Sequence, residues 1–364
     1  MPKQFAFFLP QYHQIPENDS WWGEGFTEWV NVKKAKPLYR GHQQPKLPAN
    51  NFFYNLLNKS TVEWQTNLMK QYHVDGLIYY HYYFKGKKLL EQPAENLLRW
   101  KEIEQPFFFC WANHSWFRSW EGSKELLMEM EYGIEEDWEK HFQYLLSFFQ
   151  DPRYEKRNNQ PLFMVFQNSF SEKNEMFAFF DRRCKESGFD GICLIETWNS
   201  EKKQIAVEQM FPRLSVHTKF VFVREPGFAT ELYRMEIIKK PERILRTMRR
   251  HFRKWIHSKH PEIYDGNRLY SLKTRLETHH PRVIHGTFFE WDNTPRHKER
   301  GYVITPVDKA HFFQYMDKMR DEEYLFINAW NEWAEGMMIE PTMKYGARYL
   351  EWIAEWVEKN SLVL

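Results

Sequence analysis

Residues 324–336 read YLFINAWNEWAEG, a short apolar run that passes directly into a turn of amides, carboxylates and tryptophans. Its length and its aromatic and β-branched residues predict a buried β-strand. Seven similar runs precede it, at 5–9, 76–84, 106–111, 161–167, 191–197, 219–223 and 283–290. Apolar residues recur between runs at intervals of three and four, which predicts amphipathic helices at 61–73, 135–149, 171–187 and 307–319.

Strands that alternate with helices indicate a parallel sheet. About eight such units in 364 residues favour an α/β fold of the closed (β/α)8 TIM-barrel type, with residues 1–364 as a single catalytic domain. An open doubly wound sheet is the alternative, but no glycine-rich phosphate loop follows the first run. Two connections exceed the repeat, at 10–60 and 224–280. The second is partly basic and helical, and we expect an insertion or lid there.

The charge balance bears on the class of partner. The chain has 51 basic and 49 acidic side chains, a formal net charge of +2, which gives no reason to expect nucleic acid or an anionic membrane. No stretch approaches the ~20 apolar residues of a membrane span, and the start lacks the pattern of a signal peptide. Three cysteines form no even framework, so we expect a reduced, cytoplasmic location. The oligomeric state is not predicted.

Tryptophans and polar residues gather where the predicted strands end. Active sites of parallel barrels lie at the carboxyl ends of the strands, and 16 tryptophans offer flat rings that can stack on sugars. An aromatic core is the alternative explanation. Carboxylates, amides and histidines would bind sugar hydroxyls. The candidate carbohydrate-binding residues are Tyr12, His13, Trp22, Glu28, His81, Tyr82, Asn113, His114, Trp116, Glu196, Trp291, Asp292, Asn293, Trp330, Asn331 and Trp333.

The candidate catalytic residues are Glu332 and Glu335, three positions apart in one turn. That spacing places both side chains on the same side of the backbone. Two nearby carboxylates repel each other, so the pKa of one rises while that of the other stays low. One group can then donate a proton and the other accept one, as glycosidic cleavage requires. Two solvated glutamates at the start of a surface helix are the alternative.

We expect neither a metal ion nor a cofactor. The histidines that follow the strands, His13, His42, His81 and His114, match no zinc-binding spacing. Substrate binding is the better interpretation for His81 and His114, and a structural role is equally plausible for His42. Glycosidic chemistry needs no metal.

Several motifs in the chain are long enough to be specific. They are LPQYH at 9–13, NDSWWGEGFTEWVN at 18–31, KAKP at 34–37, YHYYF at 80–84, WAN at 111–113, WDNTPR at 291–296 and NAWNEWAEG at 328–336. Together they resemble the WbsX-type proteins, usually described as glycosyltransferases of lipopolysaccharide and other surface-polysaccharide biosynthesis. The WbsX pattern usually has Glu after Trp-Ala-Asn, where this chain has His114, so an acidic contact is expected to be missing or changed.

The last motif also resembles the Trp-Asn-Glu-Trp-x-Glu-Gly segment of glycoside hydrolase family 99, retaining endo-α-mannosidases and endo-mannanases on (β/α)8 barrels. That resemblance implies that Glu332 assists the 2-hydroxyl of the substrate through a 1,2-anhydro sugar. It implies that Glu335 is the general acid and then the base that activates water, and that Asn331 holds a sugar hydroxyl. Likeness outside this motif is slight, so a preference for mannose is not implied.

The first functional hypothesis is a retaining glycoside hydrolase or transglycosylase that acts on an α-linked poly- or oligosaccharide. A biosynthetic glycosyltransferase is the second, although an Asp-x-Asp motif and a phosphate-binding glycine loop are missing from the sequence. A carbohydrate-binding barrel without catalytic activity is the third.

Overall fold

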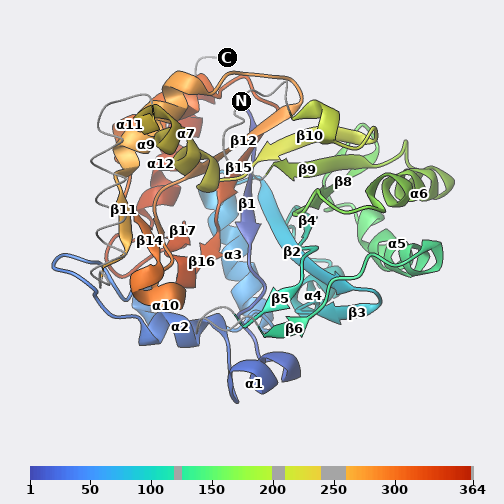
Figure 1. The fold of residues 1–364 in the computed structure, drawn as a ribbon, viewed down its shortest axis with the longest axis horizontal. Helices are drawn as coiled ribbons and strands as arrows, with labels where there is room; N and C mark the ends of the chain where they lie inside the picture. Colours follow the sequence, from blue (N-terminus) through green and yellow to red (C-terminus); the bar gives the residue numbers. More distant parts are fainter. Residues whose placement is uncertain (119–124, 199–209, 239–259, 362–364) are drawn as a thin grey trace.

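Eight parallel strands form a closed barrel in the computed structural model, which describes residues 1–118, 125–198, 210–238 and 260–361 (Figure 1). In order around the barrel they are β1 (Lys3–Phe8), β2 (Gly76–Phe84), β4 (Phe107–Trp111), β8 (Gln160–Val165), β9 (Cys193–Trp198), β10 (Thr218–Val223), β12 (Val283–Phe288) and β15 (Tyr324–Asn328). Because β1 pairs with both β15 and β2, the sheet has no free edge. Each strand falls on one of the eight apolar runs, and the predicted (β/α)8 fold is confirmed.

Helices surround the barrel and link its strands (Figure 1). The four predicted helices are α3 (Lys59–Gln71), α5 (Glu135–Phe149), α6 (Lys173–Glu186) and α11 (Lys309–Lys318). The others are α1 (Pro16–Trp22), α2 (Glu28–Lys34), α4 (Gln92–Arg99), α7 (Gly227–Ile238), α9 (Gly266–Leu276), α10 (Thr294–His297) and α12 (Arg348–Ser361), with 3-10 turns η1 (Ala49–Asn51), η3 (Phe211–Arg213), η4 (Lys298–Arg300) and η5 (Trp333–Glu335).

Short strands lie outside the barrel in the connections. They are β3 (Lys87–Leu89), β5 (Trp116–Phe117), β6 (Leu126–Met128), β7 (Lys156–Arg157), β11 (Glu262–Tyr264), β13 (Trp291–Asp292), β14 (Tyr302–Ile304), β16 (Asn331–Glu332) and β17 (Met337–Met338). β14 pairs with β11 and with β13, so residues from the 224–280 segment and residues after β12 share one small sheet.

Aromatic rings fill the interior of the barrel. Phe7 of β1 lies 5.3 Å from Phe222 of β10 between ring centroids, and Phe222 lies 5.3 Å from Phe326 of β15. Phe108 of β4 packs 5.6 Å from Phe326. Side chains alternate between the two faces of a strand, so residues an even number of positions from these rings also face the barrel axis. Part of the unusual aromatic content is therefore core packing.

The 224–280 segment contains α7, β11 and α9, and α9 packs against both α7 and α11. Lys273 of α9 is buried and forms ion pairs with Glu225 and Glu277. Its Nζ lies 2.7 Å from Oε1 of Glu277. The hydroxyl of Tyr315 on α11 donates to Glu277 at 2.5 Å. The basic stretch of the 224–280 segment lies within residues 239–259, outside the described residues. The expected insertion or lid therefore stays a prediction. No helix in the described ranges is both long and apolar enough to cross a membrane.

Candidate functional site

The turn after β15 is fixed by contacts to the segment after β1. The side-chain oxygen of Asn331 accepts from the Leu9 N–H at 2.8 Å, and its amide nitrogen donates to the Leu9 carbonyl at 3.0 Å. The Tyr12 hydroxyl donates to the Asn331 carbonyl and accepts from the Trp333 N–H at 3.2 Å. Gly336 ends the turn at φ 55°, where a Cβ would lie 3.0 Å from that of Asp292.

Arg296 of α10 reaches three carboxylates at the mouth of the barrel. Its Nη2 lies 3.1 Å from Oε1 of Glu28 and 3.8 Å from Oε2 of Glu332. Its Nη1 donates to Oε1 of Glu335, whose other oxygen accepts from the Trp291 indole at 3.0 Å. Glu28 at the start of α2 is fully buried. One cation thus holds acidic residues from α2 and from the motif turn together.

The two glutamates of the turn have opposite electrostatic environments. Burial, with the charge of Glu335, raises the pKa of Glu332 to about 8. Burial also opposes ionisation of Glu335, but Arg296 and the Trp291 hydrogen bond outweigh it and hold the pKa of Glu335 below its usual range. At neutral pH the pair therefore carries one proton, on Glu332. The alternative of two solvated glutamates does not fit Glu332, which is 7% exposed.

Aromatic side chains line the same mouth. Tyr80 and Tyr82 of β2 have the parity of the inward-facing residues, and the negative charge of Glu332 adds to burial in raising both of their pKa values. The Trp116 ring packs edge-on to Tyr82 at 5.0 Å, and Trp21 lies 5.7 Å from Trp116. The Arg118 guanidinium covers Trp22 at 5.3 Å. Tyr80 and Tyr82 thus lie near Glu332, and the tryptophans extend this aromatic surface away from the pair through Trp116.

Two predicted substrate-binding residues lie outside the mouth. His81 faces α5, where its Nε2 contacts Nε2 of His141 at 2.9 Å and its ring stacks on Phe109. Glu196 is fully buried between β9 and α6, and it accepts from Lys173 at 3.0 Å, from the Ser215 N–H and from the Thr218 hydroxyl. Both side chains point away from the barrel axis toward the surrounding helices. The apolar runs did not show which face of the strand each residue occupies.

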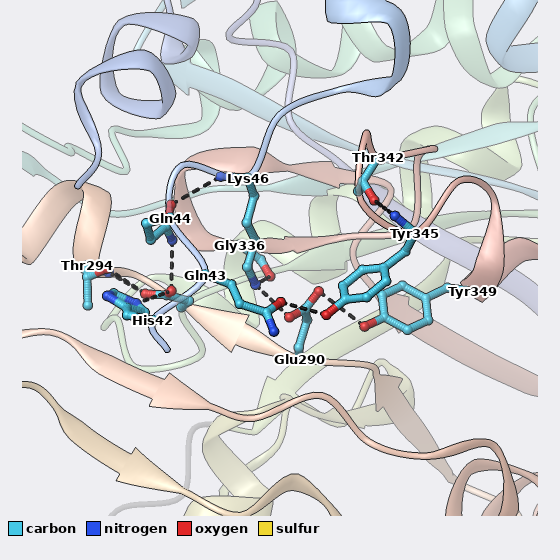
Figure 2. A network of polar contacts seen from close by, with 11 residues as sticks. His42, Gln43, Gln44, Lys46, Glu290, Thr294, Gly336, Thr342, Tyr345 and Tyr349 are labelled. Atoms are coloured by element: carbon cyan, nitrogen blue, oxygen red, sulfur yellow. Dashed lines mark hydrogen bonds and ion pairs between the residues drawn. The ribbon is translucent and has the colours of Figure 1, made fainter. Parts of the chain in front are cut away.

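Asp292 binds the N-terminal excursion to the barrel instead of facing solvent. Nε2 of His42 and Nε2 of Gln44 each lie 2.8 Å from Oδ2 of Asp292, and the Thr294 hydroxyl donates to Oδ1 at 2.6 Å (Figure 2). Nearby, Lys46 donates to Glu290 at 2.7 Å and to the Gly336 carbonyl at 3.0 Å (Figure 2). This network positions the end of the motif turn and gives His42 a structural role.

Further predicted residues are buried supports of the site. Trp330 is fully buried, and Trp333 donates from its indole to Glu340 at 2.7 Å. Asn113 exchanges two hydrogen bonds with the backbone of Gln167, at 2.8 and 2.7 Å. Asn293 accepts from the Tyr302 N–H at 2.7 Å. The side-chain oxygens of all three amides thus accept hydrogen bonds from the protein, Asn331 from Leu9, Asn113 from Gln167 and Asn293 from Tyr302.

Of the other two histidines predicted to bind substrate, His13 is buried and His114 is partly buried. Burial lowers the pKa of each to about 4, so both are neutral at pH 7. Nδ1 of His114 has no hydrogen-bond partner among the described residues.

Two cations that face the acidic pair were missing from the predicted site. Arg296 was visible as the last residue of the WDNTPR motif, four positions after Asp292. Arg224 directly follows β10, and the neighbouring Glu225 pairs with Lys273. Tyr80 was also missed, although it precedes Tyr82 by two positions and therefore shares its face.

Potential metal ligands are scattered. In the described part of the chain, no group of three or more His, Cys, Asp or Glu side chains is arranged to hold a metal ion. The three cysteines are buried and unpaired.

Comparison with known proteins places the chain in a family. Residues 4–353 match the family described as glycosyltransferase WbsX. The chain belongs to the WbsX family. Two proteins called WxcX, from two strains of Xanthomonas campestris pv. campestris, are each 29% identical over 357 residues. This WbsX chain is covered to 95% in those alignments but spans about half, 48%, of each relative.

Solved structures share the fold of this WbsX chain. The GH99 endo-α-mannosidase of Bacteroides thetaiotaomicron has a TM-score of 0.54 at 12% identity, over 98% of this chain and 97% of that one. A glycoside hydrolase-like protein has a TM-score of 0.53 at 11% identity, over 85% of this chain and 89% of that one. At such identities the likeness concerns the fold.

Proposed function

We propose that the chain is a carbohydrate-active enzyme, a retaining glycoside hydrolase or transglycosylase that acts on an α-linked poly- or oligosaccharide. The observation that carries the proposal is the pair Glu332 and Glu335, one carboxyl group protonated and one ionised on a single turn at the mouth of the barrel. Glycosidic cleavage needs one group of each kind. The aromatic rings of Tyr82 and Trp116 beside the pair suit the face of a sugar.

The roles within the pair depend on where its proton lies. The resemblance to family 99 assigns proton donation to Glu335 and assistance of the 2-hydroxyl to Glu332. The pKa shifts favour a proton on Glu332, because Arg296 and Trp291 stabilise the Glu335 anion. The implied roles therefore require the proton to pass to Glu335 when a substrate separates it from Arg296. The reversed roles, with Glu332 as the acid, require no such transfer.

Hydrolysis can be tested with purified protein and a panel of bacterial surface polysaccharides, by measuring new reducing ends. We expect release by the wild-type protein and its loss in Glu335→Gln. Glu351→Gln is the matched control, because Glu351 is an exposed residue of α12. Full activity in Glu335→Gln would refute the role of the pair. Products longer than the substrate, made without new reducing ends, would identify transglycosylation.

A glycosyltransferase that uses an activated sugar donor is the second candidate, favoured by the family description. Calorimetric titration with common nucleotide sugars tests it, and an absence of binding across them would rule it out. A binding barrel without catalysis predicts glycan binding that survives in Glu332→Gln and Glu335→Gln, with no turnover by the wild-type protein.

A further inference from the structure

Arg224 points toward the mouth of the barrel. It lies two positions after Phe222, whose ring faces the barrel axis, and it follows the last residue of β10. Side chains two positions apart share a face. The guanidinium carbon of Arg224 lies 4.2 Å from the centroid of the Phe166 ring, which follows β8. The ring supports the flat side of the guanidinium, so that its N–H groups remain available at the edge.

Arg224 differs from the other cations of this region in having no carboxylate partner. Arg296 is compensated by Glu28 and Glu335, and Lys46 by Glu290. Arg224 is exposed, and within the described ranges it forms no ion pair. Its charge acts on Glu332 and Glu335 and favours their ionised forms, but no carboxylate in the described part of the chain forms an ion pair with it.

His114 shares the surface on which Arg224 lies. Its ring centroid is 5.1 Å from that of Phe166, so the imidazole and the guanidinium contact the same aromatic ring. Nδ1 of His114 is buried, and no described residue satisfies it. The imidazole is neutral at pH 7 because burial and Arg224 lower its pKa to about 4. It adds a hydrogen-bonding group beside Arg224 without adding charge.

We propose that Arg224 and His114, supported by Phe166, bind an oxyanion carried by the substrate, either a carboxylate or a phosphate attached to a sugar. A planar guanidinium matches both groups through paired N–H donors. This subsite rests on the proposed function for its place next to the reacting sugar. The subsite would restrict the substrate to acidic glycans or phosphorylated sugars. Arg224 would then bind the substrate, whereas the glutamate pair would carry out the reaction.

The test is calorimetric titration of the whole chain at pH 7 with three probes. Digalacturonate, which is α-1,4-linked, carries carboxylates, α-D-glucose 1-phosphate carries a phosphate, and maltose is a neutral α-linked control. We expect at least one acidic probe to bind more tightly than maltose, and Arg224→Gln to weaken that binding by about tenfold. Lys219→Gln is the matched control, since Lys219 is exposed near the start of the same strand.

A second variant places a negative charge against the same arginine. His114→Glu should weaken the acidic probe at least as much as Arg224→Gln, while His114→Gln should have a smaller effect because it adds no charge. Binding of glucose 1-phosphate alone would identify a phosphate subsite, and binding of digalacturonate alone a carboxylate subsite. Circular dichroism confirms that each variant is folded.

The proposal is overturned if neither acidic probe binds more tightly than maltose, or if Arg224→Gln and Lys219→Gln behave alike. Its failure is separable from failure of the proposed function. Release of reducing ends from a neutral glycan, with no acidic binding, would retain the enzyme and refute the subsite. Acidic binding that depends on Arg224, with no turnover of any glycan, would retain the subsite and refute the enzyme.

Discussion

Trp291 and Glu335 are joined by a hydrogen bond of 3.0 Å from the indole Nε1 to Oε2, although β13 and η5 lie far apart in the sequence. The bond, together with Arg296 on the other oxygen, favours the ionised form of Glu335. The carboxylate therefore persists to lower pH than an ordinary glutamate. The ring of Trp291 also stacks on Tyr302 at 5.9 Å, so its position does not depend on the hydrogen bond alone.

Trp291→Phe should raise the pKa of Glu335 while preserving the stacking. Loss of one hydrogen bond to a charged group corresponds to about one pH unit. We expect the acidic limb of the kcat/KM profile on a cleaved glycan to move upward by about that amount. Measurement of the profile between pH 3 and pH 7 (roughly the range in which glutamates titrate) checks this. An unchanged acidic limb would show that the indole has no influence on the pair.

Glu332 should make the stability of the protein fall as the pH rises. Its pKa is raised to about 8 in the folded protein, so the unfolded chain loses this proton at lower pH than the folded chain. The favourable contribution is present below the unfolded pKa of about 4.5 and is lost progressively up to about pH 8. Glu332→Gln removes that dependence.

The measurement is the free energy of unfolding from urea titrations at several pH values. Glu332→Gln should gain stability relative to the wild-type protein as the pH rises from 5 to 8, about the interval between the two pKa values. Glu351→Gln on α12 serves as the exposed control. A difference between Glu332→Gln and wild type that stays constant over this interval would contradict the raised pKa.

The barrel was predictable because its strands are buried on both faces. Runs such as 76–84 and 324–330 are apolar at nearly every position, and this marks a strand between a core and a helix layer. The same property hides which face each residue occupies. His81 and Tyr82 are adjacent in one run, yet His81 faces α5 while Tyr82 faces the mouth. Only the position of the strand in the closed sheet determines which of the two side chains points inward.

Substrates with activated leaving groups, tested on variants of the two glutamates, should determine which glutamate donates the proton. An enzyme that lacks its general acid still cleaves a substrate whose leaving group needs no proton. If Glu335 is the acid, then Glu335→Gln should retain a first-turnover release of the leaving group from a glycosyl fluoride or nitrophenyl glycoside of the cleaved sugar, while the second step, which uses Glu335 as the base, stays slow. Glu332→Gln should then remain inactive on the same compounds.

The reversed roles predict the reverse result, with retained cleavage in Glu332→Gln only. Initial rates on the natural and the activated substrate, compared for each variant, provide the measurement. Equal losses on both substrates in both variants would show that neither carboxyl group acts as the acid. The wild-type protein should lose activity above about pH 8 in either case, as the shared proton leaves the pair.

The acidic pair itself was visible in the sequence, whereas its contact with Arg296 was not. Three-residue spacing and the neighbouring tryptophans indicated Glu332 and Glu335, and both lie at the mouth. The partner cation Arg296 comes from the connection after β12, and contacts between distant segments leave no local pattern. Trp330 and Trp333 were expected to bind sugar, but both are almost fully buried and pack in the main hydrophobic core.

Asn331 provides a test of whether a motif residue supports the fold or binds the substrate. The resemblance to family 99 implies that Asn331 binds a sugar hydroxyl. In the structure its side chain instead forms hydrogen bonds with the backbone N–H and carbonyl of Leu9. Asn331→Ala would leave the Leu9 N–H and carbonyl buried without partners. We expect a loss of about 3 kcal/mol in the free energy of unfolding, measured by urea denaturation.

Asn331→Asp separates the two bonds, because a carboxylate still accepts from the Leu9 N–H but no longer donates to its carbonyl. Because the position is fully buried, the ionised Asp facing the Leu9 carbonyl should be at least as destabilising at pH 7 as Asn331→Ala, and protonation of the carboxyl at low pH should restore a donor and part of the stability. A substrate-binding role predicts another pattern, with nearly unchanged stability and a KM that rises in both variants. Since Asn331 is fully buried and its oxygen already accepts a backbone hydrogen bond, we expect the stability pattern, with activity lost only as far as the turn that carries Glu332 loosens.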